Sequence, residues 1–118
     1  MGEEEVMEKI LFIDDRKRPE MYFGFGGVEV TWAKNCKEAL RLWKDGDFNT
    51  VYLDNDLGPG IQGYQLLRKM IDIREPKKVY SITNNFVARK CIRGVCNDFD
   101  IEFEVGLTIF EKIDKGLI

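Results

Sequence analysis

The fold is decided by the stretch Tyr52-Leu53-Asp54-Asn55-Asp56-Leu57-Gly58-Pro59-Gly60. The residues that lead into it alternate, with Val51 and Leu53 on one face and Thr50 and Tyr52 on the other, which is typical of a buried strand. The strand then ends in two carboxylates and a Gly-Pro-Gly turn, which cannot continue a strand.

A second apolar stretch, Ile10-Leu11-Phe12-Ile13, ends in the same way, at Asp14 and Asp15. The acids at the ends of these two strands can lie close together only if the strands are parallel. Open α/β sheets bind ligands in the crevice beyond the carboxyl ends of their strands. Clustered carboxylates repel one another, so we expect a cation among Asp14, Asp15, Asp54 and Asp56. Oxygen ligands without sulfur or imidazole suit Mg²⁺, Mn²⁺ or Ca²⁺. The alternative is that strand-end aspartates only cap turns, but two adjacent acidic pairs favour the cation site.

The composition indicates one ordinary globular domain over residues 1–118, with a polar leader at 1–8. The net charge is −3 with Lys and Arg spread along the chain, so the sequence shows no strong nucleic-acid signature. No apolar run is long enough to cross a membrane. Three cysteines without paired spacing indicate reduced thiols and a cytoplasmic location. The chain has no histidine, which removes the fourth ligand of a zinc site and excludes Ser-His and Cys-His catalysis.

Five predicted strands alternate with helices along the chain, which predicts an α/β fold: a single, doubly wound, five-stranded parallel sheet with the flavodoxin-like order 2-1-3-4-5. The predicted strands are 10–13, 28–32, 50–53, 79–83 and 101–105. The predicted helices are a short irregular one within 19–27, then 36–45, 64–75, 86–95 and one that begins after Thr108.

Some details of these helices follow from local patterns. Capping boxes are predicted for Asn35 with Glu38 and for Thr108 with Glu111. In helix 86–95, the spacing places Cys91 toward the core.

Two polar segments flank the predicted acidic pocket. Arg16, Lys17 and Arg18 could reach back over it and pair with phosphate, or they could be a solvated charge run. The segment Thr83-Asn84-Asn85 could donate hydrogen bonds to an oxyanion, or it could cap the next helix. The residues alone leave both choices open.

These residues resemble those of a receiver domain of the response-regulator superfamily, over nearly the whole chain. On that resemblance Asp14 and Asp15 hold Mg²⁺, Asp54 is the phosphoacceptor and Thr83 is the switch hydroxyl. The chain departs from the receiver pattern in two places. The loop after Asp54 is one residue longer, and Val105-Gly106 stands where a receiver ends its fifth strand with lysine.

The local motifs resemble more narrowly the cyclic-phosphate processing receiver family, known from phage and bacterial genomes. Its Asp-Asp-x-Arg-x-Pro is similar to residues 14–19, its Leu-Asp-His-Asp-Leu-Gly to 53–58, its Gly-Tyr to 63–64 and its His-Ser-x-Asn to 82–85. The resemblance implies a role with cyclic phosphate ends in RNA processing. Asn55 and Ile82 replace the two family histidines, and neither residue titrates, so acid–base work by those histidines is lost.

Three functions follow from these observations. The first is a regulatory or binding module that holds Mg²⁺ or Mn²⁺, with a phosphoryl group or phosphate ligand, and controls a protein partner. The second is a metal-dependent phosphoesterase acting on cyclic or terminal phosphates. The third is an inert pseudo-receiver that works through protein contacts. The missing histidines and strand-five lysine disfavour the enzyme, and the acids favour the first function over the third. The candidate residues are the reacting groups Asp54, Asp56 and Thr83, the metal ligands Asp14, Asp15 and Asp54, and the ligand contacts Lys17, Arg18, Asn55 and Asn85.

Overall fold

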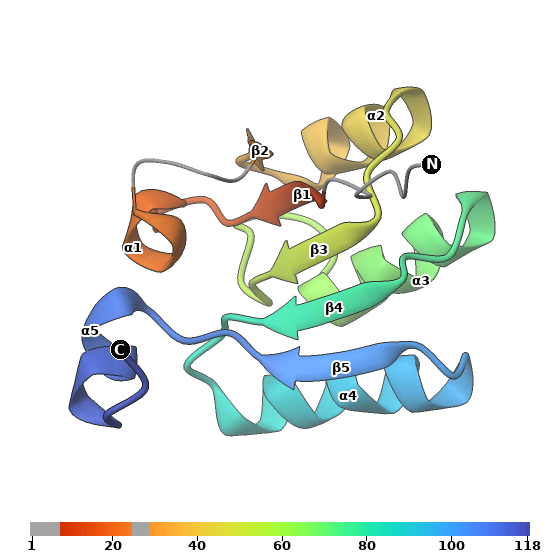
Figure 1. Cartoon of the computed structure of the whole chain (residues 1–118). Helices are drawn as coiled ribbons and strands as arrows, with labels where there is room; N and C mark the ends of the chain where they lie inside the picture. Colours follow the sequence, from red (N-terminus) through yellow and green to blue (C-terminus); the bar gives the residue numbers. More distant parts are fainter. Residues whose placement is uncertain (1–7, 25–28) are drawn as a thin grey trace, which may run out of the picture.

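The computed structural model describes residues 8–24 and 29–118. Within these ranges five strands alternate with five helices (Figure 1): β1 Lys9–Ile13, α1 Glu20–Phe23, β2 Glu29–Ala33, α2 Cys36–Asp45, β3 Thr50–Leu53, α3 Gly63–Ile73, β4 Lys78–Ser81, α4 Phe86–Asp98, β5 Glu102–Val105 and α5 Ile109–Asp114. The predicted polar leader, apart from Glu8, lies outside the described residues, as does Val28, the predicted start of the second strand. None of the described helices is long and apolar enough to cross a membrane.

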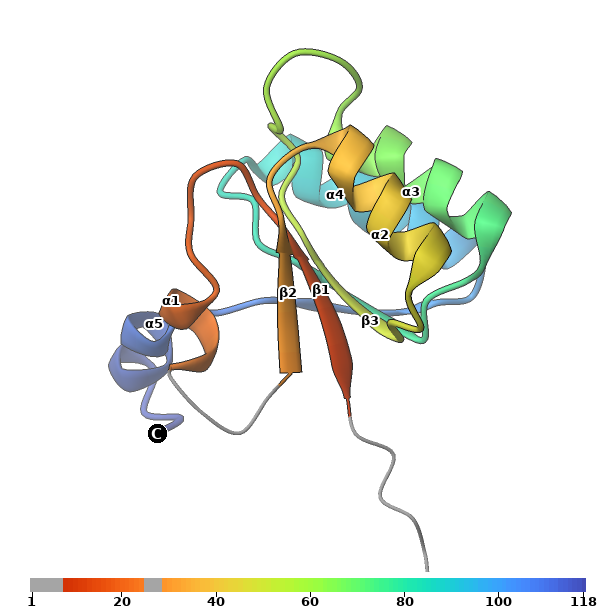
Figure 2. The ribbon, with the colours of Figure 1, turned by 90° about the horizontal axis from the view of Figure 1, so that it is seen from above.

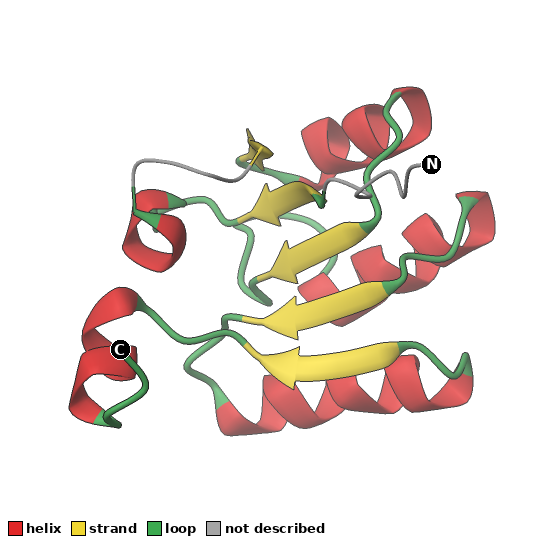
Figure 3. Cartoon of the chain, in the orientation of Figure 1, coloured by secondary structure: helices red, strands yellow, loops and turns green. Residues whose placement is uncertain are grey.

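The strands form one parallel sheet in the order β2-β1-β3-β4-β5, which confirms the predicted flavodoxin-like fold. Ile13 at the end of β1 pairs with Ala33 of β2 and with Leu53 of β3, and Leu53 in turn pairs with Ser81 of β4. The carboxyl ends of these strands are therefore level. The loops that follow β1, β3 and β4 gather at this one edge of the sheet (Figure 3).

The helices form two layers, with α2, α3 and α4 on one face of the sheet and α1 and α5 on the other (Figure 2). Val51 and Leu53 of β3 pack in the larger core with the fully buried Trp43 of α2. The intervening Tyr52 faces the other layer, where it packs with Phe12. The alternation predicted for residues 50–53 is confirmed, since successive strand residues point to opposite faces.

Polar side chains fix where α2 and α5 begin. The Asn35 side chain accepts the backbone N–H of Glu38 at 2.8 Å, and among the described hydrogen bonds only this half of the predicted capping box forms. At α5 the predicted box is complete, because Thr108 and Glu111 accept each other's backbone N–H groups.

Helix α4 is longer than predicted. It continues past Val95 to Asp98, because Cys96 is fully buried in the core and extends the apolar face by a further turn. Cys91, which was predicted to face the core, is only half-buried. Gly94 lies within this helix, where tertiary packing outweighs the low helix propensity of glycine.

Candidate functional site

The ends of β1 and β3 bring three carboxylates together. Asp14 follows Ile13 and Asp54 follows Leu53, and these strand ends pair with each other in the sheet. Carboxylate oxygens of Asp14, Asp15 and Asp54 all lie within 4.8 Å of one another. Asp14 is fully buried, Asp54 is 8% exposed and Asp15 is half-buried. Three convergent carboxylates that are largely removed from water are a suitable ligand set for a hard divalent cation.

Asp14 is held by both its side chain and its backbone. Its Oδ1 accepts the backbone N–H groups of Arg16 at 2.8 Å and of Lys17 at 3.0 Å, so the loop after β1 turns around this carboxylate. Its carbonyl oxygen accepts the indole N–H of Trp32 at 2.7 Å. Within the described residues its buried Oδ2 has no hydrogen-bond partner. A buried carboxylate oxygen without a partner is costly, and a bound cation would satisfy it.

The pKa of Asp54 is raised from 3.8 to about 6. The main cause is burial, which disfavours the charged carboxylate, and the second is repulsion from Asp14. The backbone N–H of Asn55 and the ammonium of Lys17 partly oppose this shift. A cation beside Asp54 would favour its ionised form, so a cation bound there would compete with the proton.

Lys17 places an ammonium group between β1 and β4. Its Nζ donates to the carbonyl oxygen of Ile82 at 2.5 Å and lies 3.8 Å from Oδ2 of Asp14. Gly106, at the end of β5, offers no side chain here, and a Cβ at this position would lie only 2.8 Å from Cγ2 of Ile82. The ammonium at this edge of the sheet therefore comes from the loop after β1 and not from the fifth strand.

These groups surround an open cavity of about 310 Å³. Its lining combines acidic, basic and amide side chains: Asp14, Asp15, Arg16, Lys17, Asp54, Asp56, Thr83, Asn84 and Asn85. The cavity therefore offers carboxylates for a cation together with cations and amides for an anion. A phosphate group bound through a metal ion requires both.

Most of the predicted site residues line this cavity. Asp56 is an exposed lining residue and lies outside the group of three carboxylates. Asn85 lines the cavity and also caps α4, because its side-chain oxygen accepts the N–H of Ala88 at 3.0 Å. Thr83 is buried, and its hydroxyl oxygen accepts the N–H of Asn85 at 3.1 Å. The segment 83–85 therefore caps α4, which was one of the two predicted alternatives, and it also lines the cavity.

Two predicted contacts do not line the cavity. Arg18 is exposed, and the residues of the basic segment that line the cavity are Arg16 and Lys17. The Asn55 side chain faces the loop before α3, where its Nδ2 donates to Gln62 at 3.3 Å and its Oδ1 accepts the N–H of Tyr64 at 3.4 Å. Asn55 thus connects β3 to α3 and positions the loop that carries Asp54.

Trp32 and Gly63 were not identified as site residues from the sequence. Trp32 contacts Asp14 from the neighbouring strand, which the residue pattern of β2 alone does not reveal. A Cβ at Gly63 would collide with the backbone carbonyl of Asp54, so the start of α3 packs directly against the end of β3. A glycine at a helix start next to a site is a signal for such close backbone approach.

One protein family, described as the cyclic-phosphate processing receiver domain, has a model that matches residues 9–98. A comparison with curated proteins found no match.

Several solved structures have a similar fold. Chemotaxis protein CheY4 from Vibrio cholerae is 19% identical, with a TM-score of 0.69 over 95% of this chain and 97% of that chain. Response regulator protein TrrA from Thermotoga maritima, in complex with Mg²⁺ and BeF, is 23% identical, with a TM-score of 0.65 over 94% and 96%. A CheY-like receiver domain protein from Methanospirillum hungatei is 21% identical, with a TM-score of 0.62 over 94% of each chain. At these identities the likeness shows a shared fold.

Proposed function

The chain belongs to the family of cyclic-phosphate processing receiver domains, and on that premise we propose that it is a regulatory module. Its acidic cavity would hold Mg²⁺ or Mn²⁺ and, with the ion, a phosphoryl group or phosphate ligand. The observation that carries this proposal is the convergence of Asp14, Asp15 and Asp54 within 4.8 Å, beside the ammonium of Lys17. The state of the cavity would be read by a protein partner.

The cation ligands would be Asp14, Asp15 and Asp54. Oδ2 of Asp14 fits this role, because it is buried and has no hydrogen-bond partner among the described residues. When bound, the ion would neutralise the carboxylates and attract phosphate oxygens. Manganese would serve as well, since the ligand set is all oxygen.

Of the two acids after β3, Asp54 is the better candidate to accept or contact a phosphoryl group. Asp54 lies beside Asp14 at the strand end, whereas Asp56 is exposed and its Oδ1 accepts the N–H of Gly58 at 3.3 Å. Among the described hydrogen bonds the Thr83 hydroxyl acts only as an acceptor, so its own proton would be available to an anion.

Lys17 would supply the positive charge that pairs with the phosphoryl group. It already lies at the carboxyl edge of the sheet, at the end of β4 and beside Asp14. On the resemblance to receiver domains this charge comes from a strand-five lysine, for which the present chain has Gly106. We propose that the loop after β1 replaces that lysine.

The test is an NMR titration of ¹⁵N-labelled protein with MgCl₂, followed by beryllofluoride as a phosphoryl mimic. We expect Mg²⁺ to shift the amides of Asp14, Asp15, Asp54 and Thr83, and beryllofluoride to shift them further. Asp54→Asn should lose both responses, whereas Asp56→Asn, an equal charge change two residues away, should keep them. A wild-type spectrum unchanged at millimolar Mg²⁺ would contradict the proposal and support an inert pseudo-receiver.

A second function, hydrolysis of cyclic or terminal phosphates, is favoured by one specific observation. The carboxylates that would hold the ion lie in one cavity with Lys17 and Thr83, so a bound ion would stand next to a bound phosphate. In a chain without histidine, the ion would activate the attacking water in place of a histidine base. Turnover of a 2′,3′-cyclic nucleotide with Mg²⁺ or Mn²⁺, lost in Asp54→Asn, would support the enzyme. Absence of turnover across both metals, in protein shown by NMR to bind them, would exclude it.

We also propose a cytoplasmic location. Cys36, Cys91 and Cys96 are free thiols in the folded protein, and reduced thiols persist in a reducing compartment.

A further inference from the structure

A groove lies between helices α2 and α3, outside the acidic cavity. Its volume is about 580 Å³, and it is lined by Leu40, Arg41, Lys44, Asp45, Lys69, Asp72 and Ile73. These residues belong to the C-terminal halves of the two helices, which lead into β3 and β4. In a parallel sheet that places the groove toward the edge opposite the carboxyl ends of the strands, so it is a separate surface.

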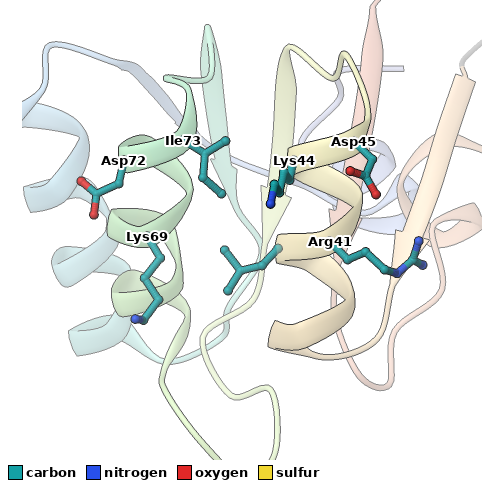
Figure 4. A pocket seen from close by; sticks show the side chains of 7 residues that line it. Arg41, Lys44, Asp45, Lys69, Asp72 and Ile73 are labelled. Carbon is teal, nitrogen blue, oxygen red and sulfur yellow. The ribbon is translucent and has the colours of Figure 1, made fainter.

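The groove combines aliphatic and cationic side chains. Ile73 is 45% exposed and Leu40 is half-buried. Lys44 of α2 and Ile73 of α3 lie opposite each other, whereas Arg41, Asp45 and Asp72 point outward from the two flanks (Figure 4). In the part of the chain that the structure describes, no carboxylate lies within ion-pair distance of Lys44.

The charge of the groove is opposite to that of the whole chain. Lys69 on α3 and Arg41 on α2 are also without a carboxylate partner among the described ion pairs. Lys44 and Lys69 are thus the cations that border Leu40 and Ile73, since Arg41 points away from the groove (Figure 4). The lining as a whole carries three cations and two carboxylates, a net charge of +1, in a protein whose net charge is −3. Exposed aliphatic residues rimmed by charge are typical of a binding groove.

We propose that this groove is the docking site for an acidic amphipathic helix of a protein partner. Aliphatic side chains of that helix would cover Leu40 and Ile73, and its carboxylates would pair with Lys44 and Lys69. The volume is that of pockets that bind side chains or small ligands. Two helices that lie side by side leave a channel along which a third helix packs. This inference goes beyond the proposed function and does not depend on cation binding.

The test begins with selection of binders from a library of randomised helical peptides. We expect the selected sequences to converge on Glu or Asp with Leu or Ile repeated every three or four residues. In an NMR titration, the strongest selected peptide should shift the amides of Leu40, Lys44, Lys69 and Ile73. Peptides without acidic residues, or shifts centred elsewhere on the molecule, would overturn the proposal.

Variants then separate the charge from the aliphatic contact. The double variant K44E/K69E should weaken peptide binding at least tenfold, because two attractive ion pairs become repulsive. Ile73→Ser should weaken binding severalfold without a change of charge. The control K90E/K115E makes the same charge change on α4 and directly after α5, and should bind within twofold of wild type. Equal weakening of the two double variants would also overturn the proposal.

A further variant distinguishes this inference from the cation site. Asp54→Asn should bind the peptide as wild type does, even though it should no longer respond to Mg²⁺.

Discussion

Replacing Asp54 with asparagine should stabilise the metal-free protein at neutral pH. Burial and the neighbouring Asp14 raise the pKa of Asp54 from 3.8 to about 6. At pH 7.5 the folded protein therefore holds an ionised carboxylate that burial disfavours. A pKa change of this size corresponds to about 3 kcal/mol, and asparagine of nearly the same shape avoids this cost. We expect Asp54→Asn to raise the free energy of unfolding by about that amount.

The size of the effect depends on pH. Below about pH 4 the carboxyl group is protonated in both the folded and the unfolded chain, so it does not make the free energy of unfolding depend on pH. Between about pH 4 and pH 6 the unfolded chain is ionised at this carboxyl while the folded protein still holds its proton, so folding must take up a proton that becomes scarcer as the pH rises. Wild-type stability should therefore fall between about pH 4 and pH 6 and level off above that, and the gap to Asp54→Asn should open over the same range.

The assay is urea denaturation followed by tryptophan fluorescence, at several pH values from 4 to 7.5 in EDTA. The matched control is Asp56→Asn, which removes an exposed carboxylate two residues away. A stability difference between wild type and Asp54→Asn that is the same at pH 4 and pH 7.5 would refute the argument. At Mg²⁺ tenfold above its Kd, wild type should gain about 1.4 kcal/mol, and Asp54→Asn should gain nothing.

Three further predictions concern groups around the cavity. Mg²⁺ should change the fluorescence of Trp32, whose indole N–H binds the carbonyl of Asp14. The change should persist in Trp43→Phe, disappear in Trp32→Phe, and be absent altogether if the ion binds elsewhere. Lys17→Met should tighten Mg²⁺ binding severalfold, because a competing cation is removed, and weaken beryllofluoride binding. Isothermal titration measures both affinities, and parallel changes would contradict the assigned role. Gly63→Ala should destabilise the protein by about 3 kcal/mol in urea denaturation, because a Cβ there meets backbone atoms; a cost below about 1 kcal/mol would show that the loop relaxes.

The sheet and the acidic cluster were predictable because both depend on patterns that repeat along the chain. Alternating apolar residues at 50–53 fixed the strand and its two faces. Parallel strands that each end in aspartate have their acids at one edge, so the proximity of Asp14 to Asp54 followed from strand order alone.

The roles of individual loop side chains could not be predicted in the same way. Arg16 and Arg18 are both next to Lys17, and only the path of the irregular loop decides that Arg16 lines the cavity. Asn55 is next to Asp54 in sequence, yet its amide is used by the loop before α3. The contact from Trp32 to Asp14 depends on the register between two strands that are separate in sequence.

The ammonium group at the cavity comes from Lys17, in the loop after β1, so the fifth strand does not have to supply it. All charged groups that line the cavity lie between Asp14 and Asp56, and its last lining residue is Asn85. The family match itself ends at residue 98, before β5 begins. The fifth strand and α5 therefore contribute no charge to the cavity. Exposed charges on this final strand–helix unit can change without altering the charged lining of the cavity, whereas positions such as Gly106, which packs closely against Ile82, are constrained.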